Sequence, residues 1–196
     1  GLVSSDLGLK GMPCEAESIM VYRDISLLER TGGRLHVAHI SCGKSVQLVR
    51  QAKTQGLPVT CEVAPHHFIL TDEAVRDFDT NAKMSPPLRA HKDVDLILDG
   101  LKDDTIDIIA TDHAPHDVSD KQVEFSSACF GIVGLETALP LTLKLVEKKV
   151  ITLSQAIVKL TQKPAEIFNL DRGTLTPGKA ADLVVFNPDQ EYVIDK

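Results

Sequence analysis

The most reactive stretch of this sequence combines one carboxylate with two imidazoles. Asp112, His113 and His116 fall within five positions, directly after the apolar run Ile106–Thr111. Such a run is typical of a buried parallel strand, and Asp112 would stand at its carboxyl end. Carboxylates and imidazoles ligate metal ions and act as general acids and bases. The motif therefore indicates a metal or acid–base site, and the alternative is an aspartate that caps a loop or helix.

A histidine near the end of a second apolar run is the next candidate. The run Leu35–Ile40 predicts a short strand, whose side chains alternate between two faces. His39 shares a face with the apolar residues of this strand, so His36 lies on the other face and only one of the two histidines can point inward. His39 and Asp112 each end a strand and could share one site. The alternative is a core histidine that bonds to a neighbour.

Four further residues receive structural interpretations. His66 and His67 follow the predicted strand Val59–Val63, and adjacent residues point in opposite directions. At most one of them faces a site, and we expect the pair to pack or hydrogen-bond within a loop. His91 lies in a polar stretch and is expected to be exposed. Cys61 shares the parity of the strand's valines and is interpreted as a small core residue.

Two loops contain groups that could contact a ligand. The segment Asn81–Arg89 contains adjacent prolines, which favour a fixed loop. Its cations Lys83 and Arg89 could bind an anionic substrate, but solvent-exposed cations are the favoured interpretation. The segment Phe125–Gly134 is either a surface connector or a loop whose Gly131 lets backbone N–H groups approach a ligand.

The predicted elements that would position these residues alternate between strand and helix. Periodicity and stop signals predict helices over Glu15–Thr31, Ser45–Gln55, Asp93–Leu101, Gly134–Glu147 and Ser154–Gln162. Strands are predicted at Leu35–Ile40, Val59–Val63 and Ile106–Thr111. This alternation favours an α/β fold with a parallel sheet, in which functional residues lie at the carboxyl ends of the strands.

The C-terminal part of the chain has a different character. A turn-rich segment, Gly173–Lys179, precedes a lone hydrophobic strand predicted over Ala181–Phe186. We therefore interpret residues 1–172 as the main domain and residues 173–196 as the beginning of a small β module. The chain has 196 residues, whereas a complete (β/α)8 barrel takes ~250.

Composition narrows the class of protein. The chain is 43% hydrophobic with a formal net charge of −7, which is typical of a globular protein and lacks the basic surface of a nucleic-acid binder. Its apolar runs are too short for a membrane span, and residues 1–10 lack a secretory signal. The four cysteines form no C-x-x-C pair. We therefore expect a reducing, cytoplasmic setting without a disulfide framework.

Several motifs together resemble the class I dihydroorotase family of the amidohydrolase superfamily. They are HVAHIS (36–41), GLPVTCEVAPHH (56–67), NAKMSPPLR (81–89), IATDHAPH (109–116), FGIVGLET (130–137) and GTLTPGKAADLVVF (173–186). The resemblance implies that residues 1–172 are the C-terminal part of a TIM (β/α)8 barrel and that residues 173–196 begin a small β-sandwich. It also implies a zinc-dependent cyclic amidohydrolase that interconverts N-carbamoyl-L-aspartate and L-dihydroorotate in pyrimidine biosynthesis.

The resemblance assigns roles to individual residues. His39 and Asp112 match metal ligands, and Asp112 also matches the catalytic acid–base. His116 matches a contact to the substrate carboxylate, and the backbone of Phe130 and Gly131 matches contacts to the pyrimidine ring. Ser85 stands where many relatives carry an asparagine that binds substrate.

The family's other metal ligands and its substrate-binding arginine belong to an upstream region that this sequence does not contain. We therefore expect the isolated chain to be an inactive partial enzyme that aggregates or assembles. The resemblance leaves open a homo-oligomer and an aspartate transcarbamoylase partner. Two alternatives remain: a non-catalytic scaffold that binds aspartate transcarbamoylase, and an amidohydrolase acting on another cyclic ureide.

Overall fold

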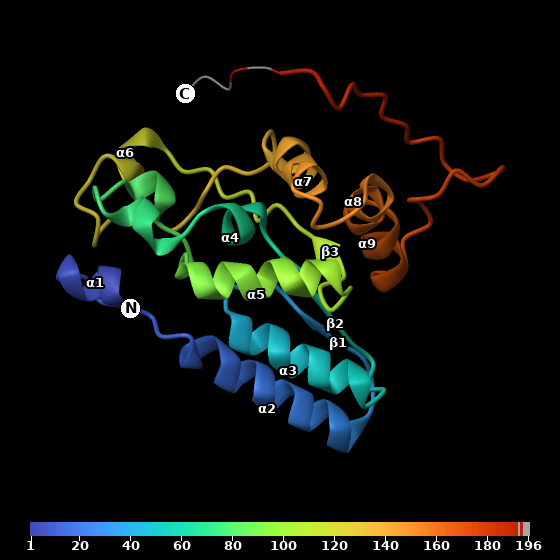
Figure 1. The fold of residues 1–196 in the computed structure, drawn as a ribbon, viewed down its shortest axis with the longest axis horizontal. Helices are drawn as coiled ribbons and strands as arrows, with labels where there is room; N and C mark the ends of the chain where they lie inside the picture. Colours follow the sequence, from blue (N-terminus) through green and yellow to red (C-terminus); the bar gives the residue numbers. More distant parts are fainter. Residues whose placement is uncertain (192, 194–196) are drawn as a thin grey trace.

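The centre of the molecule is a small parallel sheet. The computed structural model describes residues 1–191 and 193. Its three strands lie side by side in the order β1 (Leu35–Val37), β2 (Val59–Val63) and β3 (Ile108–Ile109) (Figure 1). Both pairings are parallel. A further parallel bridge between His113 and Ile132 continues the pairing beyond β3. The predicted α/β alternation is confirmed, although β1 and β3 are shorter than expected.

Helices cover the sheet and connect its strands. The longer ones are α2 (Glu15–Thr31), α3 (Gly43–Thr54), α5 (His91–Lys102), α7 (Ala138–Glu147) and α8 (Leu153–Leu160). These five confirm the predicted helices: α2 has the predicted bounds, and each of the other four is shifted at one or both ends. The shorter ones are α1 (Leu2–Asp6), α4 (Pro65–Ile69), α6 (Val118–Lys121), α9 (Gln162–Ile167) and the 3-10 turns η1 (Asp72–Val75) and η2 (Thr80–Ala82).

Helix α2 shows how local sequence determines an element. Its buried residues Val21, Ile25 and Leu28 recur at helical spacing and form one apolar face. The helix ends at Gly32, whose φ of 72° lies in the left-handed region that glycine adopts without steric cost. Both observed ends coincide with the predicted range.

Helix α3 packs closely against α5, and two glycines make this possible. A Cβ added to Gly43 would lie 2.2 Å from Leu96 Cδ1. A Cβ added to Gly100 would lie 2.7 Å from Val46 Cγ1. Neither position has room for a larger side chain, so the two helices approach through their glycines. Figure 1 shows α3 between α2 and α5.

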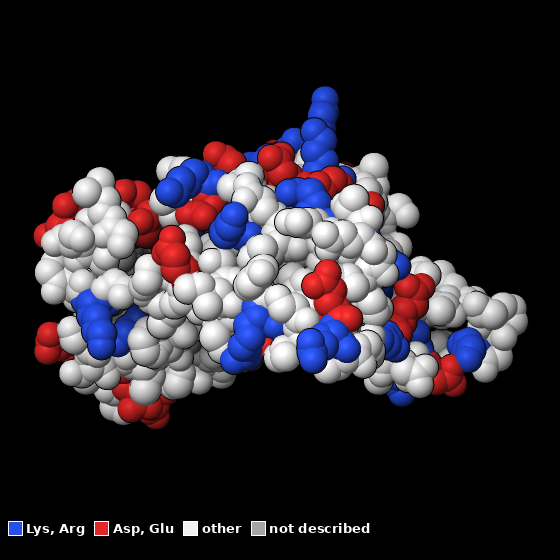
Figure 2. All heavy atoms as spheres, turned by 90° about the horizontal axis from the view of Figure 1, so that it is seen from below, with Lys and Arg blue, Asp and Glu red and all other residues white. Residues whose placement is uncertain are grey.

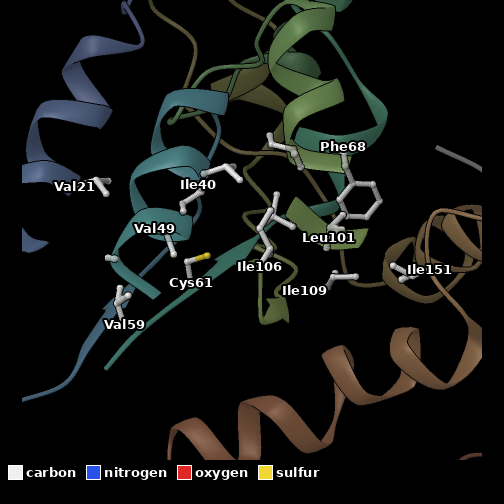
Figure 3. Packing of buried hydrophobic residues seen from close by; sticks show 14 of the residues in the cluster. Val21, Ile40, Val49, Val59, Cys61, Phe68, Leu101, Ile106, Ile109 and Ile151 are labelled. Carbon is white, nitrogen blue, oxygen red and sulfur yellow. The ribbon is translucent and has the colours of Figure 1, made fainter. Parts of the chain in front are cut away.

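The hydrophobic core lies between these helices and the strands. Val49 of α3, Leu101 of α5 and Ile106, which precedes β3, are all fully buried in it (Figure 3). Cys61 of β2 belongs to the same cluster, as predicted. Burial raises the pKa of its thiol to about 12, so the thiol stays protonated and packs as an apolar group.

The predicted strand Ala181–Phe186 is wrong. The described residues after Gly173 form neither helix nor strand, and Val185 is 99% exposed. In Figure 1 this segment, in red, extends away from the helices. A strand needs a hydrogen-bonding neighbour, and the described part of the chain brings none alongside these residues. The β-sandwich is therefore not shown, and the domain boundary at 172/173 stays a prediction.

Charged residues are spread over the surface with both signs intermixed. Figure 2 shows Lys and Arg side chains next to Asp and Glu side chains across the face seen from below. Among the described residues, no helix is long and apolar enough to cross a membrane.

We expect Leu101→Ala to lower the free energy of unfolding by about 2–5 kcal/mol, because it opens a cavity in a fully buried part of the core. Denaturant unfolding of the intact protein measures this loss. Leu27→Ala is the matched control, since Leu27 is also helical but 52% exposed. Equal losses in the two variants would contradict the assignment of Leu101 to the core.

Candidate functional site

The structure brings His39 and Asp112 together at the carboxyl ends of β1 and β3. His39 Nε2 lies 3.7 Å from Asp112 Oδ1, although the residues are far apart in sequence. Both have a positive φ, 51° at His39 and 46° at Asp112. Non-glycine residues rarely adopt this conformation, which is enriched at functional sites. The backbone turns sharply at the end of each strand, and the turns direct the two side chains toward each other.

A buried carboxylate that the sequence analysis did not single out completes this arrangement. Glu62 of the central strand β2 lies with Oε1 2.9 Å from His39 Nδ1. Its Oε2 lies 3.0 Å from His36 Nε2, and His36 Nδ1 lies 2.8 Å from Thr60 Oγ1. The sequence did contain a signal for Glu62: it is a charged residue inside an otherwise apolar strand. A buried charge requires a partner, so such a residue indicates an ionic contact.

The prediction that only one of the two histidines points inward is wrong. It assumed a regular strand through Ile40, whereas β1 ends at Val37. The positive φ at His39 breaks the alternation of side chains. His36 and His39 therefore contact the two oxygens of the same carboxylate.

Electrostatics strengthen this contact. Burial disfavours the charged form of Glu62, but the hydrogen bond with His36 and the close ionic contact with His39 outweigh burial and lower its pKa to about 2. The Glu62 carboxylate in turn raises the pKa of His39, which burial alone would lower. Glu62 is thus an anion that orients the His39 ring through Nδ1 and leaves Nε2 facing Asp112.

His39 and Asp112 fit two positions in the coordination shell of one metal ion. Ligand atoms about 2.0–2.2 Å from a tetrahedral zinc are roughly 3.4 Å apart, close to the observed 3.7 Å. A metal-bound histidine commonly uses its other ring nitrogen to contact a carboxylate, which is the place of Glu62 here. Catalytic zinc sites generally use three protein ligands, so a metal held by this pair would need a further ligand.

The other histidines of the Asp/His motif contact the loop that follows. His113 Nδ1 accepts hydrogen bonds from the N–H groups of Gly134 and Leu135, at 3.1 and 3.2 Å. His116 Nε2 donates to the carbonyl of Phe130 at 2.8 Å. The predicted substrate contacts His116 and Phe130 therefore lie side by side, and His113 is engaged in holding the loop.

Gly131 lies against the Asp/His motif with no space for a side chain. A Cβ added there would lie 2.4 Å from the carbonyl oxygen of Ala114 and 2.9 Å from His116 Nε2. Ser85, the remaining predicted substrate contact, is exposed in the loop before Pro86. Among the described residues, it forms no hydrogen bond with His39 or Asp112. Its predicted role remains untested.

The expectation that Lys83 and Arg89 are exposed is wrong, because both are buried. Lys83 Nζ donates to three backbone carbonyls of the segment 125–128. Arg89 donates to Ser41 Oγ at 3.0 Å and to the carbonyl of Met12 at 2.6 Å. Loop carbonyls removed from water need donors, and these cations supply them. His91 is exposed, as predicted.

His66 and His67 are buried in the short helix α4 rather than placed in a loop. Their rings pack edge to face with centroids 4.3 Å apart. His67 Nε2 donates to the carbonyl of Pro86 at 3.0 Å. Burial lowers the pKa of His66 to about 3 and that of His67 to about 4, so both are neutral at pH 7.

A second group of possible metal ligands lies on the exposed side of the motif. Within the described chain, donor atoms of His116, Asp120 and Cys129 lie within 4.8 Å of one another. Sequence spacing does not identify Asp120 or Cys129, because the chain must fold back to bring them to His116. The Lys121 ammonium is 2.9 Å from the carbonyl oxygen of Cys129, which disfavours a second cation at this place.

Comparisons with known proteins agree with this geometry. The amidohydrolase family model matches residues 9–196. The dihydroorotases of Geotalea daltonii and Pelotomaculum thermopropionicum are each 53% identical to the chain, over 195 and 196 residues. Each alignment covers 100% of this chain and 46% of the relative. The chain therefore spans slightly less than half the length of these curated relatives.

Solved structures give a consistent result. A D-hydantoinase is 27% identical with a TM-score of 0.87, over 93% of this chain and 42% of its own. The L-hydantoinase (dihydropyrimidinase) of Arthrobacter aurescens is 31% identical with a TM-score of 0.81, over 87% of this chain and 39% of its own. The described fold is thus similar to less than half of each of these larger enzymes.

We expect His67→Gln to reduce the acid sensitivity of the protein. Between the ordinary histidine pKa of 6.5 and the folded-state pKa of about 4, the unfolded chain binds a proton that folded His67 does not. The contribution of neutral His67 to the free energy of unfolding is therefore fully present above pH 6.5. It is lost as the pH falls from 6.5 toward 4. The variant should lose about 2 kcal/mol less unfolding free energy than the wild type between pH 7 and pH 5.

Denaturant unfolding at both pH values measures this difference. His91→Gln, at an exposed histidine, is the control and should keep the wild-type loss. If His67→Gln lost as much stability as the wild type, the neutral buried state of His67 would be contradicted.

Proposed function

The chain belongs to the amidohydrolase family, and from this membership we propose that the protein is a zinc-dependent dihydroorotase. It would interconvert N-carbamoyl-L-aspartate and L-dihydroorotate. Amidohydrolases share the TIM-barrel fold and are typically metal-dependent. The observation that carries the proposal is the His39–Asp112 pair, held at two strand ends and supported by the buried Glu62. The choice of dihydroorotate as the substrate is supported by the similarity to curated dihydroorotases.

His39 Nε2 and an oxygen of Asp112 would hold the zinc ion, together with the ligands that the family carries upstream of the region matched here. A bound zinc ion would supply Lewis acidity, which lowers the pKa of water toward ~7 and polarises the scissile amide. Glu62 would keep the His39 ring in the orientation and tautomer that place the Nε2 lone pair toward the metal.

Asp112 would transfer the proton during ring opening. Its carboxylate accepts a proton from the attacking water as the oxygen bonds to the ring carbonyl carbon. It then delivers that proton to the ring nitrogen as the carbon–nitrogen bond breaks. Ring opening leaves an N-carbamoyl group and a new carboxyl group, whose remaining water-derived proton dissociates to solvent. The reverse sequence takes up that proton and closes the ring.

The loop after the Asp/His motif would bind the substrate. His116 would contact the substrate carboxylate, while the backbone of Phe130 and Gly131 would contact the ring. The hydrogen bond between His116 and the Phe130 carbonyl supports this grouping, because it places the proposed contacts next to each other. Ser85 would reach the substrate from the neighbouring loop, with a shorter side chain than asparagine.

Two other interpretations lead to different experimental results. A non-catalytic scaffold would have no use for a carboxylate and a histidine aimed at each other, so the His39–Asp112 geometry disfavours it. The similarity to hydantoinase structures keeps another cyclic ureide as an alternative substrate. Assays of the intact protein with dihydroorotate, hydantoin and dihydrouracil separate these cases. A homo-oligomer and an aspartate transcarbamoylase partner remain predictions from the family resemblance.

We expect Asp112→Asn to reduce kcat for dihydroorotate hydrolysis by roughly 100-fold or more, because an amide cannot accept the proton. The assay uses the intact zinc-loaded enzyme, with circular dichroism as a check on folding. Asp95→Asn is the control, since Asp95 is exposed on α5, and its activity should equal that of the wild type. A folded Asp112→Asn variant with wild-type kcat would disprove the assigned role.

His39→Ala should weaken metal retention. Removing an imidazole ligand leaves one fewer protein donor for the ion. We expect less zinc per protein by elemental analysis after dialysis than in the wild type, with His91→Ala as the control. Undiminished zinc content in His39→Ala would exclude His39 as a ligand.

A further inference from the structure

Lys83 is a buried cation that binds the backbone of one loop. It follows the turn η2, and only 7% of its surface is exposed. Its ammonium nitrogen lies 2.7, 3.0 and 2.6 Å from the carbonyl oxygens of Phe125, Ser126 and Ala128. An ammonium group has three protons to donate, so all of them have acceptors in this one loop. The ammonium group of Lys83 therefore has its hydrogen-bond partners within the protein and needs none from a ligand.

The same loop is attached to Lys83 in two further ways. The ammonium nitrogen lies 5.5 Å from the ring centroid of Phe125 and 4.5 Å from that of Phe130. These are cation–π distances, and the surroundings are desolvated. The backbone N–H of Gly131 donates to the carbonyl of Lys83 at 2.9 Å. Side chain and main chain of one residue thus contact the loop from its start to Gly131.

A second lysine binds the other end of the loop. Lys121 Nζ donates to the carbonyls of Cys129 and Gly131 at 2.9 and 2.7 Å, and to that of Thr80 at 2.9 Å. Phe130 lies in the part of the loop between the carbonyls that Lys83 binds and the carbonyl of Gly131 that Lys121 binds. Phe130 is 52% exposed. The loop therefore presents Phe130 outward while its backbone is held from behind by two ammonium groups.

We propose that Lys83 is a positioning residue that fixes the segment Phe125–Gly131 so that the backbone of Phe130 and Gly131 is preorganised to bind the substrate ring. The inference rests on the proposed function, which places Phe130 and Gly131 at the substrate. Lys83 itself does not touch the reacting atoms. Its effect passes through the loop carbonyls and through the Phe130 ring.

This role predicts a particular kinetic result. Without Lys83, the loop samples many conformations, and substrate binding must select the competent one. The Asp112–His39 pair does not contact Lys83, so the chemical step on bound substrate should be nearly unchanged. Loss of Lys83 should therefore raise KM rather than lower kcat.

The test compares Lys83→Met with the wild type in the intact zinc-loaded enzyme. Methionine keeps the length of the side chain and removes both charge and donors. We expect KM for dihydroorotate to rise roughly tenfold or more, with kcat within about threefold of the wild type. Hydrogen–deuterium exchange should accelerate roughly tenfold at the amides of residues 125–131. Lys148→Met, at an exposed lysine, is the matched control and should change neither readout.

Lys83→Arg is the conservative variant. It keeps the charge and several donors, so its KM and its loop exchange should lie between those of the wild type and Lys83→Met. If Lys83→Met does not fold, Lys83→Arg decides the question by the same two measurements.

Three results would overturn the inference. They are an unchanged KM in a folded variant, a fall in kcat at constant KM, and faster exchange throughout the protein instead of in the loop. The exchange readout does not depend on which ureide is the substrate. Absence of dihydroorotate turnover in the wild type would instead refute the proposed function and leave the loop measurement valid.

Discussion

A buried carboxylate on the central strand is the constraint on which the site depends. Glu62 cannot remain charged inside the sheet without partners, which are His36 of β1 and His39 just after it. The contact with Glu62 leaves one nitrogen of His39 free to face Asp112 beyond β3. The contacts of Glu62 with His36 and His39, and of His39 with Asp112, therefore link the ends of all three strands and orient the candidate metal ligands.

The parallel sheet makes this link possible. Its strands end at a common edge, so residues far apart in sequence meet there. The close contact of α3 with α5, through Gly43 and Gly100, keeps the helices near the strands they cover. The hydrogen-bonded pairing of β1 with β2 and of β2 with β3 sets the spacing of the strand ends, and these ends carry His39 and Asp112.

Around the site, cationic side chains stabilise the loops. Lys83 and Lys121 donate to backbone carbonyls of the loop that ends at Gly131, and Arg89 donates to Ser41 Oγ and to the carbonyl of Met12. Loops need such donors because their polar groups lack the regular partners of helices and strands. The described residues after Gly173 are attached through exposed ion pairs at Asp182 and Lys179, and Leu183, Val184 and Val185 are exposed. Local hydrophobicity therefore did not suffice to make a strand there.

Reading the sequence was enough to predict the α/β alternation, the parallel sheet, the bounds of α2 and the choice of His39 and Asp112 as candidates. These features follow from periodicity, stop signals and the position of polar residues after apolar runs, all of which are local. Only the tertiary structure decided that Glu62 pairs with two histidines, that Lys83 is buried, and that Ala181–Phe186 forms no strand. Each of these depends on whether a distant segment supplies a partner, and the spacing of residues along one chain does not contain that information.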